Sequence, residues 1–375
     1  MPIMSTGPDV PPYQIQTLLN DIFTQTSSQI TCAQALGNEI YVGTSHGELF
    51  QFMLTGAEDK LETYIIVSRQ IVPGEKPVDD IVLIPSISRA LVQSDRQIHF
   101  YTLPNLEPDP IKPIRNVMTF AVDDQHLRRP APKSNPALGY STHVDPVEFC
   151  VVKRSGIAMF SLRERLFYSR EIPLPQSQGA GSVLAKRAGK YLCFADKENY
   201  NMVDLEDAQL FPLLPISQAP SQDGAKIRPM INVISENEFL ILSWTGASTL
   251  GLFITGDGDP VRGTLEWPSY PLGICLDYPH VTSLLPNGTV EVHSVDTQAQ
   301  LQVIPPPPSS SRPTSPAVRL PSSPSSIPSP RHQNIASSLS QRLAMIASVG
   351  GYQVPSLQRS ECMRKVPFKL LRTPC

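Results

Sequence analysis

The chain repeats one strand–turn–strand pattern along almost its whole length. Each copy consists of an apolar run, a short turn that is polar or contains glycine, and a second apolar run. The clearest copies are residues 40–52, 90–103, 149–162, 191–205, 239–254 and 280–294. A single hairpin cannot bury both of its faces, whereas hairpin units repeating every ~40–60 residues can cover one another when they are arranged around an axis. The repeat therefore predicts an all-β fold, a β-propeller.

Additional strands surround these hairpins. Apolar runs at residues 78–85, 229–238 and 271–279 each precede a hairpin, and residues 261–267 can supply an outer strand. Four strands in each unit is the pattern of a propeller blade, whose inner strands are apolar on both faces because neighbouring blades cover them. A weaker copy at residues 343–354 brings the expected number of blades to seven.

The last hairpin competes with a helical interpretation. Ile335, Leu339 and Leu343 recur with a spacing of four residues, which is typical of a helix. The glycine pair at residues 350–351 and the apolar return that follows favour a hairpin.

The composition divides the chain into a propeller and flanking segments. Residues 113–146, rich in proline and polar residues, are predicted to form a long surface loop between blades. The expected divisions are a flexible N-terminus (1–12), the propeller body (13–304), a Pro/Ser-rich insertion (305–334), the last hairpin (335–358) and a basic tail (359–375).

The insertion has too few large apolar residues to offset the entropy of ordering it, so we predict that it is disordered. Ser315, Ser323 and Ser329 each precede a proline there. These three serines are candidate sites of proline-directed phosphorylation.

Charge and cysteine content narrow the class of protein. The formal net charge of the 375 residues is −3, which gives no support to nucleic-acid binding. The first residues do not form a secretory signal, and no apolar run reaches the ~18–20 residues that span a bilayer. The six cysteines are scattered without CxxC spacing. A cytoplasmic protein with reduced thiols is expected.

The motifs of enzymes and metal sites are incomplete in this sequence. The glycines at 179–182 lack the lysine of a phosphate-binding loop, and residues 256–260 lack the later glutamate of a calcium loop. The acidic pairs Asp79–Asp80 and Asp123–Asp124 are interpreted as ordinary strand-edge or loop charges. We therefore predict no catalytic, metal or cofactor site, and a protein that is not an enzyme.

Several motifs occur in a recognisable order. Residues 30–32 read Ile-Thr-Cys, and residues 41–49 read Tyr-Val-Gly-Thr-Ser-His-Gly-Glu-Leu. A Lys-Pro-Val start at residues 76–78 leads to a Leu-Glu-Pro turn at residues 106–108. This order resembles the citron homology (CNH) domain, a divergent propeller family, across most of residues 13–304.

Within that family, the chain looks most similar to the branch of TGF-beta-receptor-associated protein and vacuolar sorting protein 3. The resemblance implies a subunit of the CORVET tethering complex, peripheral on endosomal or vacuolar membranes. Its expected partners are an endosomal Rab GTPase, other tethering subunits and, through them, the membrane. The basic tail would then be the start of a helical solenoid that this chain lacks.

Three alternatives stay open at this point. The chain could be a Vam6-like subunit of the related HOPS complex, or a regulatory CNH domain from a kinase or Rho exchange factor. An enzyme that uses the central funnel would need convergent polar residues on inner strands, and Val42, Val92 and Val151 favour packing there instead.

Overall fold

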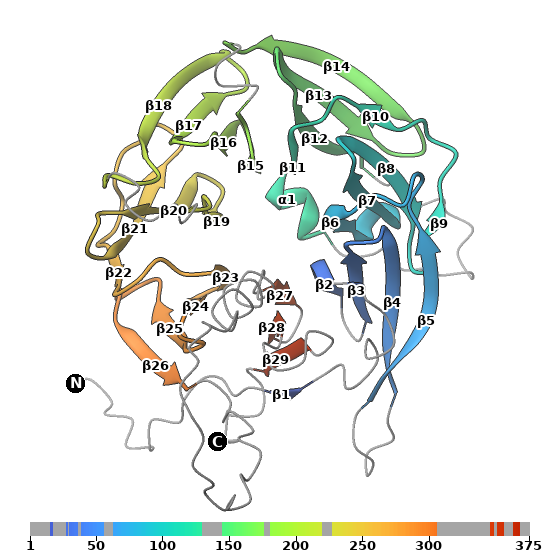
Figure 1. Cartoon of the computed structure of the whole chain (residues 1–375). Helices are drawn as coiled ribbons and strands as arrows, with labels where there is room; N and C mark the ends of the chain where they lie inside the picture. The colour runs from blue at the N-terminus through green and yellow to red at the C-terminus, as the bar shows by residue number, and fades with distance from the viewer. Residues whose placement is uncertain are drawn as a thin grey trace, which may run out of the picture.

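Small antiparallel sheets surround a central axis (Figure 1). The computed structural model describes residues 28, 30–36, 39–55, 63–129, 145–175, 181–219 and 227–305, together with the strand segments 16–17, 346–348, 351–355 and 363–367. Six blades are formed within residues 30–304. The prediction of an all-β propeller is confirmed.

The first three blades follow one another along the chain. The first contains β2 (Ile30–Leu36), β3 (Glu39–Thr44), β4 (Glu48–Thr55) and β5 (Thr63–Ile71). The second contains β6 (Val78–Ile84), the 3-10 turn η1 (Pro85–Ile87), β7 (Arg89–Ser94), β8 (Gln97–Thr102), β9 (Glu107–Pro108) and β10 (Ile114–Arg115). The third contains β11 (Thr119–Val122), the short helix α1 (Asp124–Leu127), β12 (Val147–Val152), β13 (Gly156–Leu162) and β14 (Leu166–Pro173).

The next three blades each have four strands in sequence order. The fourth contains β15 (Leu184–Ala188), β16 (Tyr191–Ala195), β17 (Asn199–Asp204) and β18 (Gln209–Pro215). The fifth contains β19 (Ile231–Ser235), β20 (Glu238–Trp244), β21 (Thr249–Thr255) and β22 (Leu265–Trp267). The sixth contains β23 (Gly273–Asp277), β24 (His280–Leu284), β25 (Val290–Ser294) and β26 (Gln300–Ile304).

The expected number of seven blades is corrected to six in the part of the chain whose side chains are described. A further small sheet joins β1 (Gln16–Thr17) to β29 (Met363–Pro367), β28 (Gly351–Pro355) and β27 (Ile346–Ser348). Its strand β27 contacts β2 and β23, between the first and sixth blades. The prediction missed that this sheet draws its strands from both ends of the chain, because strand pairing across more than 300 residues leaves no local pattern.

The segment 113–146 was wrongly predicted to be a surface loop throughout. It contains β10, β11 and α1, and β11 is the first strand of the third blade. All four residues of β11 are buried, and β11 pairs with β12. The strand has only four residues, which is too short for its period to stand out beside the proline-rich sequence that follows. Residues 130–144 lie outside the described part.

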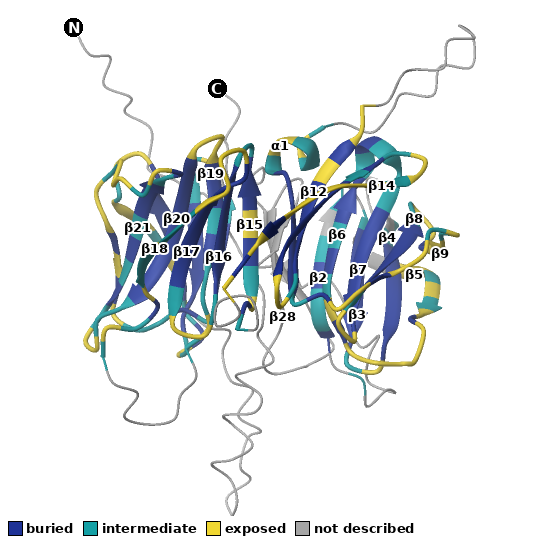
Figure 2. Cartoon of the chain, turned by 90° about the horizontal axis from the view of Figure 1, so that it is seen from above, coloured by how far each residue is buried: buried dark blue, intermediate teal, exposed yellow. Residues whose placement is uncertain are grey.

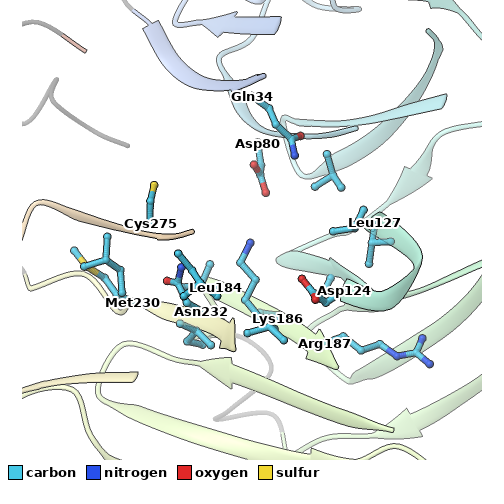
Figure 3. Close-up of a pocket in the computed structure, with 18 of the residues that line it drawn as sticks. Gln34, Asp80, Asp124, Leu127, Leu184, Lys186, Arg187, Met230, Asn232 and Cys275 are labelled. Atoms are coloured by element: carbon cyan, nitrogen blue, oxygen red, sulfur yellow. The ribbon is translucent and has the colours of Figure 1, made fainter. Parts of the chain in front are cut away.

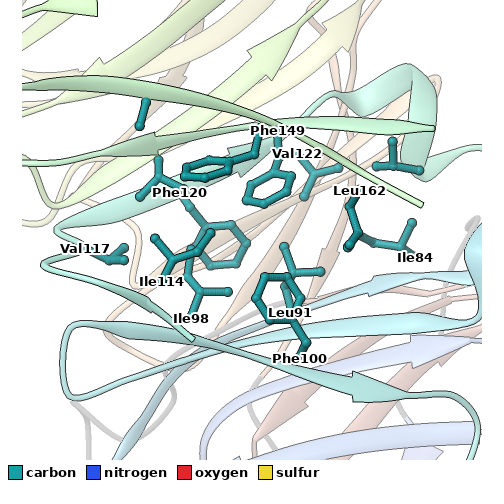
Figure 4. Packing of buried hydrophobic residues seen from close by; sticks show 14 residues of the cluster. Ile84, Leu91, Ile98, Phe100, Ile114, Val117, Phe120, Val122, Phe149 and Leu162 are labelled. Atoms are coloured by element: carbon teal, nitrogen blue, oxygen red, sulfur yellow. The ribbon is translucent and has the colours of Figure 1, made fainter. Parts of the chain in front are cut away.

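The apolar side chains pack between blades, as the repeat predicted. Figure 4 shows Leu91 and Phe100 of the second blade against Phe120 and Phe149 of the third. Similar clusters join the first blade to the second, the third to the fourth, the fourth to the fifth and the fifth to the sixth. Burial is greatest in the inner strands of the blades and lower in the outer strands and the turns (Figure 2). Each blade therefore needs its neighbours to cover its faces.

Two glycines of the motif at residues 41–49 serve different purposes. A Cβ at Gly43 would lie 2.6 Å from a methyl carbon of Val78, so glycine there permits close approach of the first two blades. Gly47 has φ +75°, and a Cβ there would lie 2.8 Å from the carbonyl oxygen of Lys76. Glycine at position 43 leaves room for neighbouring side chains, whereas glycine at position 47 is required by its left-handed backbone and by the nearby backbone of Glu75 and Lys76.

Candidate functional site

A cavity of about 650 Å³ lies on the axis of the ring (Figure 3). Residues from the first strand of each of the six blades line it, namely from β2, β6, β11, β15, β19 and β23. The helix α1 contributes Asp124 and Leu127, and Arg128 follows directly after it. The cavity is therefore the central channel of the propeller.

The channel is polar on part of its wall and apolar on the rest. Gln34, Asp80, Lys186 and Asn232 contribute polar side chains from four different blades. Leu184, Met230, Ile274 and Cys275 also line the cavity. A pocket that is largely apolar with a few convergent polar groups is the usual form of a small-molecule site.

Asp80 is a carboxylate of this wall whose pKa departs from its ordinary value. Burial raises its pKa, while the nearby Lys186 ammonium and the amide N–H of Ile81 work in the opposite direction. Its Oδ1 accepts a hydrogen bond of 2.9 Å from the backbone N–H of Ile81. Among the described residues, Asp80 and Lys186 have no ion-pair partner within 4 Å.

The orientation of Lys186 follows from that of its neighbour in β15. Successive side chains of a strand point to opposite faces, and Arg187 points away from the channel in Figure 3. The Arg187 Nε donates to the carbonyl oxygen of Gly189 at 2.8 Å, and its Nη2 donates to Glu148 at 2.8 Å. Because Arg187 is held between blades, Lys186 is directed into the channel.

Asp123 lies beside Arg187 at the contact between the third and fourth blades, and it directly precedes α1, which lines the channel. Its carboxylate accepts hydrogen bonds from the N–H groups of Gln125 and Gly189, each at 3.2 Å, and lies 3.7 Å from Arg187. The first of these bonds caps α1, because an N-cap carboxylate satisfies a free N–H at the helix start. Asp124, the next residue, forms an ion pair of 2.6 Å with Arg128.

The strands that line the channel differ from those that the sequence analysis placed at the central funnel. Val42, Val92 and Val151 are fully buried, as expected for packing residues. They lie in β3, β7 and β12, the second strands of their blades. The strands that face the axis precede each hairpin, and they carry Asp80 and Lys186.

One signal in the sequence pointed to this site. An aspartate pair at residues 79–80 interrupts an apolar run that was itself expected to be a strand. The structure brings Asp80 and Asp124 to one cavity, while Asp123 is buried beside Arg187. These pairs were interpreted as ordinary charges because Lys186 and Arg187, which lie near them in the fold, are in another blade.

The described residues offer little to nucleophilic or metal chemistry. Among them, no group of three or more His, Cys, Asp and Glu side chains is placed to hold a metal ion. Cys32, Cys150 and Cys193 are free thiols, and Cys275 is not part of a disulfide with any of them. Burial raises the pKa of Cys150 to about 11 and also raises the pKa of Cys193, so both thiols are protonated and unreactive at neutral pH.

The predicted phosphorylation sites Ser315, Ser323 and Ser329 lie outside the described residues. They stay a prediction.

Two outer strands expose large apolar side chains. In β14, Phe167 is 60% exposed and Tyr168 is 58% exposed. In β5, Ile65, Ile66, Val67 and Ile71 are each about half exposed. Aromatic side chains on a rigid edge are typical of protein–protein contacts.

A family model agrees with this architecture over most of the chain. The model of the VPS3 N-terminal domain matches residues 26–305, a range that includes all six blades. The chain belongs to the VPS3 N-terminal domain family. The resemblance that the sequence motifs predicted is confirmed.

Curated relatives of this family member are much longer. Transforming growth factor-beta receptor-associated protein 1 of Mus musculus is 27% identical over 286 residues, which are 74% of this chain and 30% of the relative. Vacuolar protein sorting-associated protein 3 of Saccharomyces cerevisiae is 21% identical over 304 residues, which are 78% of this chain and 27% of the relative. The chain thus spans less than a third of the length of either relative.

Among solved structures, the AfRom2 CNH domain aligns with this chain at a TM-score of 0.49 and 17% identity, over 78% of this chain and 89% of that one. Within the residues that the structure describes, none of the helices has the length and apolar character of a membrane span.

Proposed function

We propose that the chain is the propeller part of a non-enzymatic subunit of an endosomal or vacuolar tethering complex of the CORVET type. The family match over residues 26–305 is the observation that carries this proposal. The name of the yeast relative refers to vacuolar protein sorting. The protein would be cytoplasmic and would reach the endosomal or vacuolar membrane through its partners.

In this proposal the propeller docks a Rab GTPase and other subunits of the complex. Blades that pack against one another form a rigid ring, so exposed edges and turns can vary without loss of the core. The edge of the third blade suits such docking best, because Phe167 and Tyr168 expose aromatic surface beside the charged Arg170 of the same strand. Aromatic and arginine side chains dominate the binding energy of many interfaces.

The test is capture of Rab GTPases by the purified chain, with each GTPase loaded with a GTP analogue or with GDP. We expect GTP-selective capture of an early-endosomal Rab. Capture of a late-endosomal Rab alone would favour the HOPS-type alternative. A folded chain that captures no Rab in either state would contradict the Rab role.

Two matched variants locate the contact. Phe167→Ser on β14 should weaken capture by at least about tenfold if this edge is the docking site. Ile65→Ser on β5, which removes an apolar side chain of similar exposure from another blade, is the control and should leave capture unchanged. Equal effects of both variants would argue against the third blade.

We also propose that the Pro/Ser-rich insertion is a disordered segment phosphorylated at Ser315, Ser323 and Ser329. Mass spectrometry of the protein from its native cells, with and without phosphatase, tests this proposal. Unmodified peptides at all three positions would overturn it.

A further inference from the structure

Two opposite charges that face the channel, Asp80 and Lys186, form no ion pair with the residues that the structure describes. Asp124 pairs with Arg128, and Arg187 pairs with Glu148, so these charges are compensated. Asp80 and Lys186 lie on β6 and β15, and the described residues place no ion-pair partner within 4 Å of either. In Figure 3 the Lys186 ammonium and the Asp80 carboxylate both extend toward the middle of the cavity.

Such an arrangement is costly when the channel holds only water. Burial disfavours the ionised form of Asp80, and the Ile81 N–H and the Lys186 ammonium offset this cost in part. The two groups come from non-adjacent blades, since the third blade lies between the second and the fourth. A molecule with one group of each sign would complement both.

The other side chains that line the channel indicate which further groups such a molecule would carry. Gln34 uses its Oε1 to accept a hydrogen bond from the N–H of Leu83, so the NH₂ of its amide stays available as a donor. Among the described residues, the side-chain amide of Asn232 has no hydrogen-bond partner. Leu184, Met230 and Ile274 offer apolar contact. A volume of about 650 Å³ suits a small molecule rather than a folded partner.

We propose that the central channel binds a small zwitterion, in which an ammonium group pairs with Asp80, a carboxylate or phosphate pairs with Lys186, and a short apolar portion contacts Met230 and Leu184. Asp124 and the helix α1 lie at one end of this channel (Figure 2). The inference does not depend on the tethering role.

The experiment is calorimetric titration of the purified chain with L-leucine and, separately, with O-phosphoethanolamine. The two probes share an ammonium and an acidic group, but only leucine has an apolar side chain. Saturable one-to-one binding of either probe is expected, and the tighter one identifies the acid as carboxylate or phosphate. Leucinamide and N-acetyl-leucine each lack one charge and should bind at least about tenfold more weakly than leucine, if leucine is the tighter probe.

Variants test whether the channel is the site. Lys186→Met and Asp80→Asn should each weaken binding by about tenfold or more, because each leaves one ligand charge without its partner. Lys197→Met, in the exposed turn between β16 and β17, is the matched control and should bind as the unmodified chain does. Circular dichroism confirms that each variant is folded.

Three results would overturn the inference. These are binding of neither probe at up to ~10 mM to the folded chain, equal binding of the singly charged analogues, or full binding by both channel variants.

Discussion

The contact between the third and fourth blades differs in kind from the contact between the fifth and sixth. The first adds buried charges to its apolar cluster, since the buried Arg187 of β15 bridges Glu148 and Asp123 of the neighbouring blade. The second depends on an aromatic ring, since the fully buried Trp267 of β22 packs against His293 of β25.

Each contact contains one buried nitrogen that has no hydrogen-bond partner among the described residues. At the charged contact Arg187 donates to Gly189 and Glu148, and its Nη1 is the atom without a described partner. At the aromatic contact Trp267 donates from Nε1 to the Ser283 hydroxyl at 2.7 Å, and the Nδ1 of His293 is the atom without a described partner.

The difference shows that one fold can join equivalent blades by two routes. The charged contact needs its partners in place, because a buried ion without them is strongly unfavourable. The aromatic contact needs volume, because its stability comes from buried apolar surface. Substitutions at the charged contact should therefore lower stability by leaving a buried charge unpaired, and substitutions at the aromatic contact should lower it by leaving a cavity.

The largest effect is expected at the aromatic contact. Trp267→Ala removes a fully buried indole and leaves a cavity between the fifth and sixth blades, so it should lower the free energy of unfolding by about 4 kcal/mol. Urea titration followed by fluorescence measures this change. Trp244→Ala, at a half-buried indole, is the control and should cost less than half as much. Equal losses would show that Trp267 does not hold the contact.

A somewhat smaller effect is expected at the charged contact. Arg187→Met keeps much of the volume but leaves the buried Asp123 without its cation, and should cost about 3 kcal/mol. Arg128→Met, which removes an exposed partner of Asp124, should cost about 0.5 kcal/mol or less. Thermal and urea unfolding give both values. If Arg187→Met proved as mild as Arg128→Met, the charged contact would be dispensable.

The smallest of the three effects depends on pH and belongs to the aromatic contact. Burial lowers the pKa of His293 to about 4, below its ordinary value of 6.5. As the pH falls, His293 therefore binds a proton in the unfolded chain before it does so in the folded chain. The folded state is not penalised by His293 above about pH 6.5, and it loses stability as the pH falls from 6.5 toward 4. Between about pH 7 and about pH 5 the loss should be about 2 kcal/mol.

Neighbouring groups alter this pH dependence. Burial raises the pKa of Glu291, whose protonation works in the opposite direction at lower pH. Burial also lowers the pKa of His126 near the charged contact, which adds to the loss. His293→Phe should flatten the dependence of urea unfolding on pH, while His46→Phe, in an exposed turn, should not. An unchanged slope in His293→Phe would exclude His293 as its source.

The hairpins and several first strands could be predicted from local pattern alone. β6, β19 and β23 fall within the apolar runs at 78–85, 229–238 and 271–279 that were expected to precede hairpins. The predicted outer strand at 261–267 contains β22. Alternation and turn residues determine such elements because the relevant interactions lie within a few residues.

Elements without a local pattern escaped prediction. The four-residue β11 lies in a segment that was expected to be a loop, and its burial depends on β12 and the neighbouring blades. The number of blades was predicted as seven, and six are formed by the residues whose side chains are described. The pairing of β1 with β29 joins opposite ends of the chain.

The sequence by itself determined the all-β class, the repeating hairpins and the family, because each depends on residues close together in the chain. Only the tertiary structure decided which strands face the axis and which charges meet there. Asp80 and Lys186 are separated by more than 100 residues, and their shared cavity exists only when blades from across the chain close into a ring. Side chains in different blades are brought together by packing between blades, which leaves no periodic signal in the sequence.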